Sequence, residues 1–268
     1  MRTCILHVSD LHVGARRSRD ELATGTGIAA LAEQVEAELV VVTGDITHLG
    51  RAGQHQAAAT FLRNLGRPLL VVPGNHDIPF TLPGRFTHPW RNFERQWQTT
   101  EPVYASPSVH AVGLNSVRPW RHQSGGIRNA QLARARSRMK EASPGSLRVV
   151  ALHHQLVGAP WRTRKRPVAR RNHVLAALVE SGAELILGGH IHQLAVCERH
   201  EFEAVGAEAR GVVLSVAPGF ARPRPNRRGE ARGVVVYRAD ERTLAVDAYI
   251  WLGDAWEQTA TRTFPRAG

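Results

Sequence analysis

Short apolar runs recur along the chain, and each is followed by a loop that carries aspartate, asparagine or histidine. Apolar runs of this length, bounded by glycine or proline, are typical of buried β-strands. Five of them end in polar loops, and they lie at Cys4–Val8, Leu39–Val42, Val71–Val72, Leu147–Leu152 and Leu185–Leu187. Because functional groups of α/β proteins lie at the carboxyl ends of strands, we expect the five loops to meet at one edge.

Helical periodicity fills the segments between these runs. Apolar residues from Leu22 to Val35 recur at helical spacing and predict a helix between Glu21 and Glu38. Further helices are predicted at about 54–65, 90–98, 129–140 and 171–181. The alternation of strand and helix in the N-terminal part indicates a parallel sheet with right-handed crossovers.

The C-terminal third of the chain lacks this helical period. Predicted strands at Val212–Val216, Val234–Tyr237 and Leu244–Trp251 indicate an antiparallel, β-rich region, and a further strand is expected at Val109–Asn115. A chain of 268 residues, 43% of them hydrophobic, is long enough for one well-buried core. We therefore expect a mixed α/β (α+β) fold in a single domain covering residues 1–268.

The composition favours a soluble, cytoplasmic protein. No signal peptide precedes the first predicted strand, and no apolar run is long enough to cross a membrane. The two cysteines, Cys4 and Cys197, are expected to be buried free thiols. The net charge of +12 comes almost entirely from arginine and attracts anions, although an arginine-rich proteome explains it equally well.

The polar residues of the five loops form an ordered series of motifs. The series runs D-x-H at 10–12, G-D at 44–45, G-N-H-D at 74–77, H-H at 153–154 and G-H-x-H at 189–192. It resembles the signature of the calcineurin-like metallophosphoesterases over most of the chain. The compact G-N-H-D and H-H blocks are most similar to those of the bacterial class III cyclic-nucleotide phosphodiesterases, whereas Gln155 and Leu156 stand where prolines are common in that group.

The resemblance implies an αββα sandwich of two mixed sheets flanked by helices, with a centre of two metal ions. It implies seven ligands: Asp10, His12 and His192 for the first metal, Asn75, His153 and His190 for the second, and Asp45 as the bridge. It also makes His76 the general acid that protonates the leaving alkoxide. We expect Asp77 to orient the His76 imidazole.

A donor set of aspartate, asparagine and histidine without cysteine suits manganese, iron or zinc. We expect two divalent or trivalent ions, with Mn²⁺ and iron ahead of Zn²⁺. Two such ions share a hydroxide that attacks phosphorus in line, so that no covalent intermediate with the protein is needed. The resemblance therefore implies hydrolysis of a small phosphodiester, with 3′,5′-cyclic nucleotides as the leading candidates.

Several side chains near these motifs are candidates for substrate binding. They are Arg118 in the loop after the 109–115 strand, His154, and Arg162, Arg164 and Lys165 in a basic loop after the H-H motif. Loops and charge runs of this kind are also commonly solvated, and the role of His154 stays open between substrate and protein core.

Two other functions fit the same features. The first is a pyrophosphatase or phosphodiesterase that acts on lipid- or nucleotide-linked substrates, with the basic loop on a membrane surface. The second is a nuclease or nucleic-acid-binding protein, which ranks lower because the chain has no recognised nucleic-acid-binding motif. A homodimer is compatible with the sequence but is not indicated by it.

Overall fold

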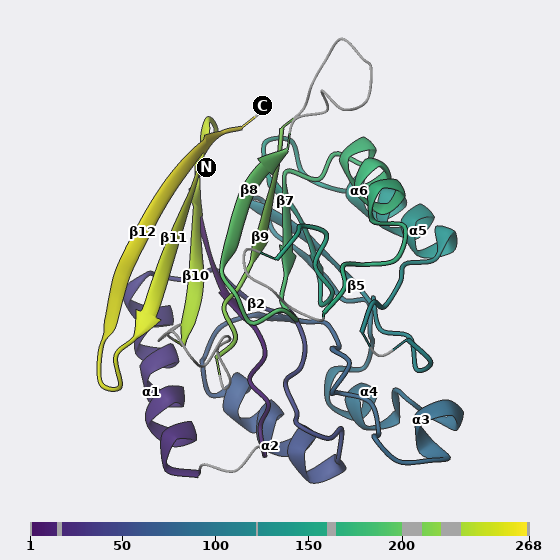
Figure 1. The fold of residues 1–268 in the computed structure, drawn as a ribbon. Coiled ribbons are helices and arrows are strands. Elements are labelled where there is room, and N and C mark those ends of the chain that lie inside the picture. Colours follow the sequence, from purple (N-terminus) through teal and green to yellow (C-terminus); the bar gives the residue numbers. More distant parts are fainter. Residues whose placement is uncertain are drawn as a thin grey trace.

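The computed structural model describes residues 2–14, 18–121, 123–159, 165–199, 211–220 and 232–266. Two six-stranded sheets face each other at the centre, and helices cover their outer faces (Figure 1). This arrangement agrees with the predicted αββα sandwich. Among the described residues, no helix combines the length and apolar character needed to cross a bilayer.

The first sheet mixes parallel and antiparallel strands in the order β12-β11-β10-β1-β2-β3. Its strands span Thr3–Val8 (β1), Leu39–Val42 (β2), Leu69–Val71 (β3), Gly233–Ala239 (β10), Thr243–Trp251 (β11) and Trp256–Pro265 (β12). β2 runs parallel to both β1 and β3, whereas β10 runs antiparallel to β1. The carboxyl ends of the first three strands therefore share one edge.

The second sheet has the order β4-β5-β6-β7-β9-β8. Its strands span Val103–Ala105 (β4), Val109–Leu114 (β5), Leu147–Leu152 (β6), Leu185–Gly188 (β7), Ala195–Arg199 (β8) and Val212–Val216 (β9). The four central strands are parallel, and the two edge strands, β4 and β8, run antiparallel to their neighbours. This sheet is also mixed.

The helices lie on the outer faces, where they cover apolar side chains of the sheets. They span Ser18–Gln34 (α1), Ala52–Arg63 (α2), Gly84–Thr87 (α3), Arg91–Trp97 (α4), Asn129–Met139 (α5) and Arg171–Glu180 (α6). Leu31 of α1 and Leu62 of α2 pack against the first sheet, whereas Leu132 of α5 and Leu178 of α6 pack against the second.

Strand alternation explains how the sandwich forms separate apolar layers. Successive side chains of a strand point to opposite faces of its sheet. Ile5 of β1 therefore packs between the two sheets, whereas the next residue, Leu6, packs against the helices. In the second sheet, Val149 and Val150 of β6 divide in the same way.

The predicted helices agree with the observed ones to within four residues at each end. Three short or exposed strands, β4, β8 and β12, were not predicted. The expectation of an antiparallel C-terminal region holds for β10, β11 and β12, but β9 pairs in parallel with β7. Both cysteines are free but only partly buried, which corrects the expectation of buried thiols.

Candidate metal centre

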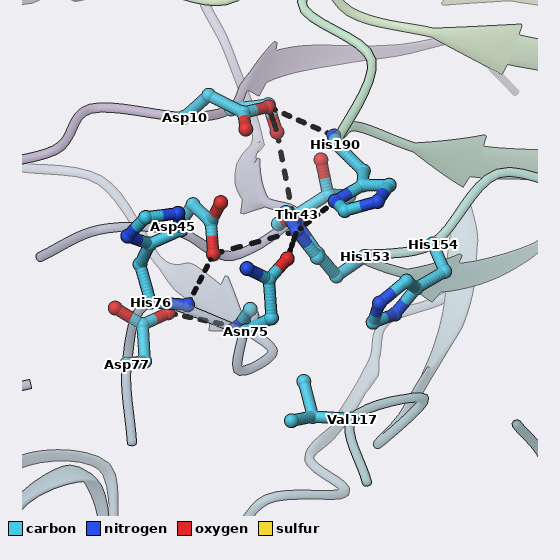
Figure 2. Close-up of polar contacts among 12 residues, drawn as sticks. Asp10, Thr43, Asp45, Asn75, His76, Asp77, Val117, His153, His154 and His190 are labelled. Atoms are coloured by element: carbon cyan, nitrogen blue, oxygen red, sulfur yellow. Dashed lines mark hydrogen bonds and ion pairs between the residues drawn. The ribbon is translucent and has the colours of Figure 1, made fainter. Parts of the chain in front are cut away.

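All seven predicted metal ligands lie in loops at the carboxyl ends of parallel strands from both sheets. Asp10, Asp45, Asn75, His153 and His190 converge there (Figure 2). Each of the seven side chains is at most 3% exposed. Five of the seven hold a left-handed backbone conformation, with φ between +47° and +72°: Asp10, His12, Asp45, His190 and His192.

The first group of donor atoms consists of Asp10, His12, Asp45 and His192. His192 Nε2 lies 2.9 Å from Asp10 Oδ1 and 3.3 Å from His12 Nε2. His12 Nε2 is 3.8 Å from Asp45 Oδ2. These atoms are the ones predicted to hold the first metal together with the bridging carboxylate.

The second group contains Asp45, His153 and His190, and Asn75 completes it. His153 Nε2 lies 3.4 Å from Asp45 Oδ1, 3.1 Å from Asn75 Oδ1 and 3.2 Å from His190 Nδ1. Asp45 therefore presents one carboxylate oxygen to each group. Its position is that of a bridge between two ions.

Backbone carbonyls determine which ring nitrogens face the second group. His153 Nδ1 donates to the Thr43 carbonyl at 2.7 Å, and His190 Nε2 donates to the Gln123 carbonyl at 3.0 Å. When neutral, each ring therefore turns its other nitrogen, with a lone pair, toward the same point. Supporting hydrogen bonds of this kind fix the orientation of metal-binding histidines.

The residues present fit bound dications. Nitrogen and oxygen atoms that share one ion through bonds of about 2.1 Å lie about 3.0–3.4 Å apart, close to the separations observed here. Asp45 Oδ2 is buried and has no hydrogen-bond partner among the described residues. Two opposed imidazole lone pairs and an unpartnered buried carboxylate oxygen are stable arrangements when a cation lies between them.

The electrostatics of the two groups favour positive charge at their centres. Burial alone would raise the pKa of Asp45, but the neighbouring His153 and His76 rings hold it well below its usual value. Burial lowers the pKa of His12 to about 3, and burial together with Lys165 lowers the pKa of His190 well below its usual value. His153 differs: burial lowers its pKa, but the Asp45 carboxylate outweighs burial and the pKa is raised. Because metal binds neutral imidazole and ionised carboxylate, metal binding at the second group releases a proton from His153.

Close backbone packing brings the loops together. A Cβ atom on Gly74 would lie 2.1 Å from the Asp45 amide nitrogen, and one on Gly189 would lie 1.9 Å from Ser9 Oγ. Only glycine permits these approaches. The glycines of the G-N-H-D and G-H-x-H motifs therefore let the ligand loops touch.

His76, the predicted general acid, lies beside the two groups and is half-buried. Its backbone amide donates to Asp45 Oδ1 at 2.8 Å, and its ring lies 4.8 Å from the His12 ring, centroid to centroid. Nδ1 of the same ring donates to the His48 carbonyl at 2.9 Å. The imidazole is thus oriented by a backbone carbonyl.

Asp77 has a different role from the one expected. Its carboxylate accepts hydrogen bonds from the backbone amides of Thr47 at 2.8 Å, Gly74 at 2.8 Å and Ile46 at 3.3 Å, and from the Thr47 hydroxyl at 3.0 Å. These contacts join the loops after β2 and β3. Asp77 therefore positions the loops that carry Asp45 and Asn75, rather than the His76 ring.

Two of the candidate substrate-binding residues, His154 and Arg118, make hydrogen bonds to other parts of the protein. His154 is buried, with Nδ1 2.9 Å from Ser116 Oγ and its ring 4.5 Å from that of His190. Arg118 donates to the carbonyls of Val117 and Asn115 at 2.8 and 3.2 Å, and also to Gln131. Both side chains make hydrogen bonds within the protein, and their contact with substrate stays a prediction.

The basic loop is described only at its end. Lys165 is partly buried and donates to the backbone carbonyl of His190, so its charge lies near the second group. Arg162 and Arg164 lie outside the described residues.

The sequence reasoning missed several residues of the centre. His48 joins His12 and His76 in a third group of imidazoles whose donor atoms lie within 4.8 Å of one another. Ser9 donates to Asp10 Oδ2 at 2.7 Å, and Thr43 orients His153. All three are polar residues next to the motifs, which is a signal that sequence inspection can use.

The profile of the calcineurin-like phosphoesterase family matches residues 4–194. This chain belongs to that family. It is thus a hydrolytic phosphoesterase, and the predicted family is confirmed. The matched region contains all five ligand loops described above.

Two sequence relatives of this phosphoesterase are named as probable cyclic nucleotide phosphodiesterases. The one from Synechococcus sp. is 26% identical over 206 residues, which are 72% of this chain and 74% of the relative. The one from Vesicomyosocius okutanii is 24% identical over 216 residues, covering 78% and 84%. A glycerophosphodiester phosphodiesterase, GpdQ, from Enterobacter lignolyticus is 34% identical over 80 residues, and the match spans 27% of this chain and 29% of that protein.

Solved structures with the same fold include a dimetal phosphatase and a purple acid phosphatase. A dimetal phosphatase from Danio rerio aligns over 99% of both chains with a TM-score of 0.69 and 13% identity. A purple acid phosphatase from yellow lupin aligns over 99% of this chain and 54% of its own, with a TM-score of 0.70 and 13% identity. At this identity the likeness shows the fold alone.

Proposed function

We propose that this phosphoesterase is a dinuclear phosphodiesterase that hydrolyses small phosphodiesters, with 3′,5′-cyclic nucleotides as the leading candidates. The observation that carries the proposal is the Asp45 carboxylate, which presents one oxygen to each of two groups of buried imidazoles. When bound, a pair of metal ions neutralises the phosphate oxygens and lowers the pKa of water enough for it to attack phosphorus. A donor set without thiolate supports manganese or iron, with zinc as the alternative.

The chain's own residues position the reaction and supply its proton. Asp10, His12 and His192 would hold one ion, Asn75, His153 and His190 would hold the other, and Asp45 would contact both. His76 lies on the solvent side of the centre, and its Nδ1 is engaged by the His48 carbonyl. The imidazolium form of this ring carries its second proton on Nε2, and Nε2 passes that proton to the leaving oxygen as the bond from phosphorus to this oxygen breaks.

Lys165 contributes positive charge for the substrate phosphate. It lies against the His190 carbonyl, beside the second group. A partly buried ammonium group is less screened than a charge on the open surface. Arg162 and Arg164 precede Lys165 in the sequence, and the proposal gives them the same role of attracting the substrate phosphate.

The sequence relatives support the choice of a diester over a monoester. Two of them are named as cyclic nucleotide phosphodiesterases and one as a glycerophosphodiester phosphodiesterase. The alignments with the relatives named as probable cyclic nucleotide phosphodiesterases cover most of this chain, and this supports cyclic nucleotides as the leading candidates.

Replacing the bridge tests the proposal. Asp45→Asn keeps the side-chain shape but removes the charge shared by both groups, so metal content should fall from two ions per chain. Because changes to residues that merely support ligands cost about 10–100-fold, turnover of bis(p-nitrophenyl) phosphate should fall at least about 100-fold.

The matched control is Asp254→Asn, a change at an exposed aspartate between β11 and β12. It should keep both metals and full turnover. Elemental analysis and steady-state kinetics measure the two quantities. Full metal content and normal turnover in Asp45→Asn would contradict the dinuclear assignment.

A further inference from the structure

The side of the metal centre that faces solvent is marked by His76. The seven predicted ligands, together with Asp77 and His154, are buried, whereas His76 is half-buried. The His76 ring is therefore open to contact with a phosphodiester bound at the centre. The residues around this ring determine what fits beside the reacting phosphate.

The rings of His12, His48 and Phe80 lie around His76. The His12 ring, which belongs to the first ligand group, lies 4.8 Å away and nearly perpendicular, at 87°. The His48 ring lies 5.9 Å away and nearly parallel, at 13°. The Phe80 ring lies 6.1 Å away at 38°. His48 is half-buried, and Phe80 is 50% exposed.

The orientation of His76 locates the leaving group relative to these rings. Because Nδ1 donates to the His48 carbonyl, Nε2 is the nitrogen that reaches the leaving oxygen. A general acid lies within about 2.6–3.2 Å of the atom that it protonates. Substituents carried by the leaving alcohol therefore extend along the His76 ring, within reach of His48 and Phe80.

Phe80 is not explained by core packing. It follows the G-N-H-D motif by three residues, and half of its ring is open to solvent. Exposed large apolar side chains are also found at Leu82 and Phe86 in the same short segment. Clusters of exposed apolar residues beside a concave site are typical of binding surfaces.

We propose that His48 and Phe80 form a leaving-group subsite that accepts a flat ring. The inference rests on the proposed acid role of His76. The subsite would favour diesters whose leaving alcohol carries a nucleobase or another aromatic ring over diesters of glycerol-like alcohols. Flat side chains bind bases by stacking, which is tolerant of base identity and changes affinity about tenfold per base.

The experiment compares two substrates that differ only in the ring. One is 3′,5′-cyclic AMP, and the other is the 3′,5′-cyclic phosphate of the same sugar without the base, so the leaving oxygen is nearly equally acidic in both. The metal-loaded wild type should favour cyclic AMP about tenfold in kcat/KM. Phe80→Ala should remove most of this preference, and His48→Ala should reduce it while keeping the backbone carbonyl that orients His76.

Leu252→Ala is the control, because Leu252 is also a large apolar side chain, 59% exposed, and it lies after β11, outside this segment. It should leave the preference for cyclic AMP unchanged. Phe80→Leu keeps apolar bulk without a flat ring and should behave like Phe80→Ala. Thermal unfolding of each variant checks that the substitution has not disrupted the fold.

The outcomes separate the subsite from the proposed function. If the metal-loaded wild type hydrolyses bis(p-nitrophenyl) phosphate but handles both cyclic diesters equally, the subsite is wrong and the phosphodiesterase stands. The subsite proposal is also overturned if Phe80→Ala lowers kcat/KM equally for both cyclic substrates. The same holds if Phe80→Leu keeps the full wild-type preference for cyclic AMP. If the wild type hydrolyses no diester with manganese, iron or zinc, the proposed function itself fails.

Discussion

The predicted ligand residues hold unusual backbone conformations. Asp10, His12, Asp45, His190 and His192 all have positive φ, in a region that costs a residue with a Cβ atom about 1–2 kcal/mol. Strain of this kind persists where the surrounding structure enforces it, and it is concentrated at functional sites. Glycine would relieve the strain at each position but would remove the donor atom. The backbone thus supports the proposed use of these side chains as ligands.

The acid role of His76 is tested at the same scale by His76→Ala. Metal content should stay at the wild-type value, because the contacts of the His76 ring do not complete either proposed metal group. Turnover of diesters with poor leaving groups should fall about 10²–10⁴-fold, and turnover of diesters with good leaving groups should fall much less. Kinetics on a series of leaving groups measure the difference. An equal loss for good and poor leaving groups would remove the acid role from His76.

The loops after β2 and β3 act as one unit. Gly74 packs against the backbone and carboxylate of Asp45, with contacts that would be 2.1 and 2.3 Å from a Cβ atom. The Asp77 carboxylate accepts amide hydrogen bonds from both loops. Hydrogen bonds to Asp77, and the absence of a side chain at Gly74, therefore help to hold the two loops together.

Gly74→Ala should separate these loops. The added methyl group meets backbone atoms that cannot move freely, so the free energy of unfolding should fall by about 1–3 kcal/mol, and metal content should fall with it. Gly53→Ala is the matched control, because a Cβ atom at Gly53 in α2 would meet nothing within 4 Å. Urea unfolding and elemental analysis measure both effects. If Gly74→Ala kept both metals, the expected dependence of metal binding on close packing of the two loops would be contradicted.

Across the whole molecule, a buried polar chain joins the two sheets beneath the centre. The Tyr237 hydroxyl of β10 donates to Ser215 Oγ of β9 at 2.7 Å, and His7 Nδ1 of β1 lies 3.0 Å from the same hydroxyl. His7 Nε2 lies 2.8 Å from Thr43 Oγ1, and the Thr43 carbonyl orients His153. The contacts between the sheets are thus continuous with the support of a proposed ligand.

The chain predicts a pH dependence of stability. Burial lowers the pKa of His7 to about 3, below its value of about 6.5 in an unfolded chain. Between these two values the unfolded state binds more protons, so this contribution to stability is present above about pH 6.5 and is lost as the pH falls. From pH 7 to pH 5, His7 should account for a loss of about 2 kcal/mol.

His7→Gln should remove this contribution. The difference in unfolding free energy between wild type and His7→Gln should shrink by about 2 kcal/mol between pH 7 and pH 5. Tyr237→Phe is the control, because it breaks the same chain of contacts but keeps the titrating ring. Urea unfolding at the two pH values measures the differences. A difference between wild type and His7→Gln that is independent of pH would contradict the effect of burial.

The order of buried strands was largely predictable because it depends on local patterns. β2 and β7 are continuous apolar runs, β1 and β6 are apolar runs interrupted by single polar residues, and the helices predicted at 21–38 and 90–98 carry apolar positions at helical spacing. β4 and β12 were missed for physical reasons. β4 spans three residues, and β12 has side chains that are mostly exposed, so neither shows the alternation of a half-buried strand.

The sequence by itself determined which polar residues follow the strands, and therefore which side chains reach the shared edge. Only the tertiary structure decided how they are used. In the folded chain, Asp77 accepts hydrogen bonds from loop amides, and His154 is buried in contact with Ser116. His48 and Phe80 lie beside His76. The reason is that strand periodicity is set by neighbouring residues, whereas side-chain partners depend on packing between segments that are distant in the sequence.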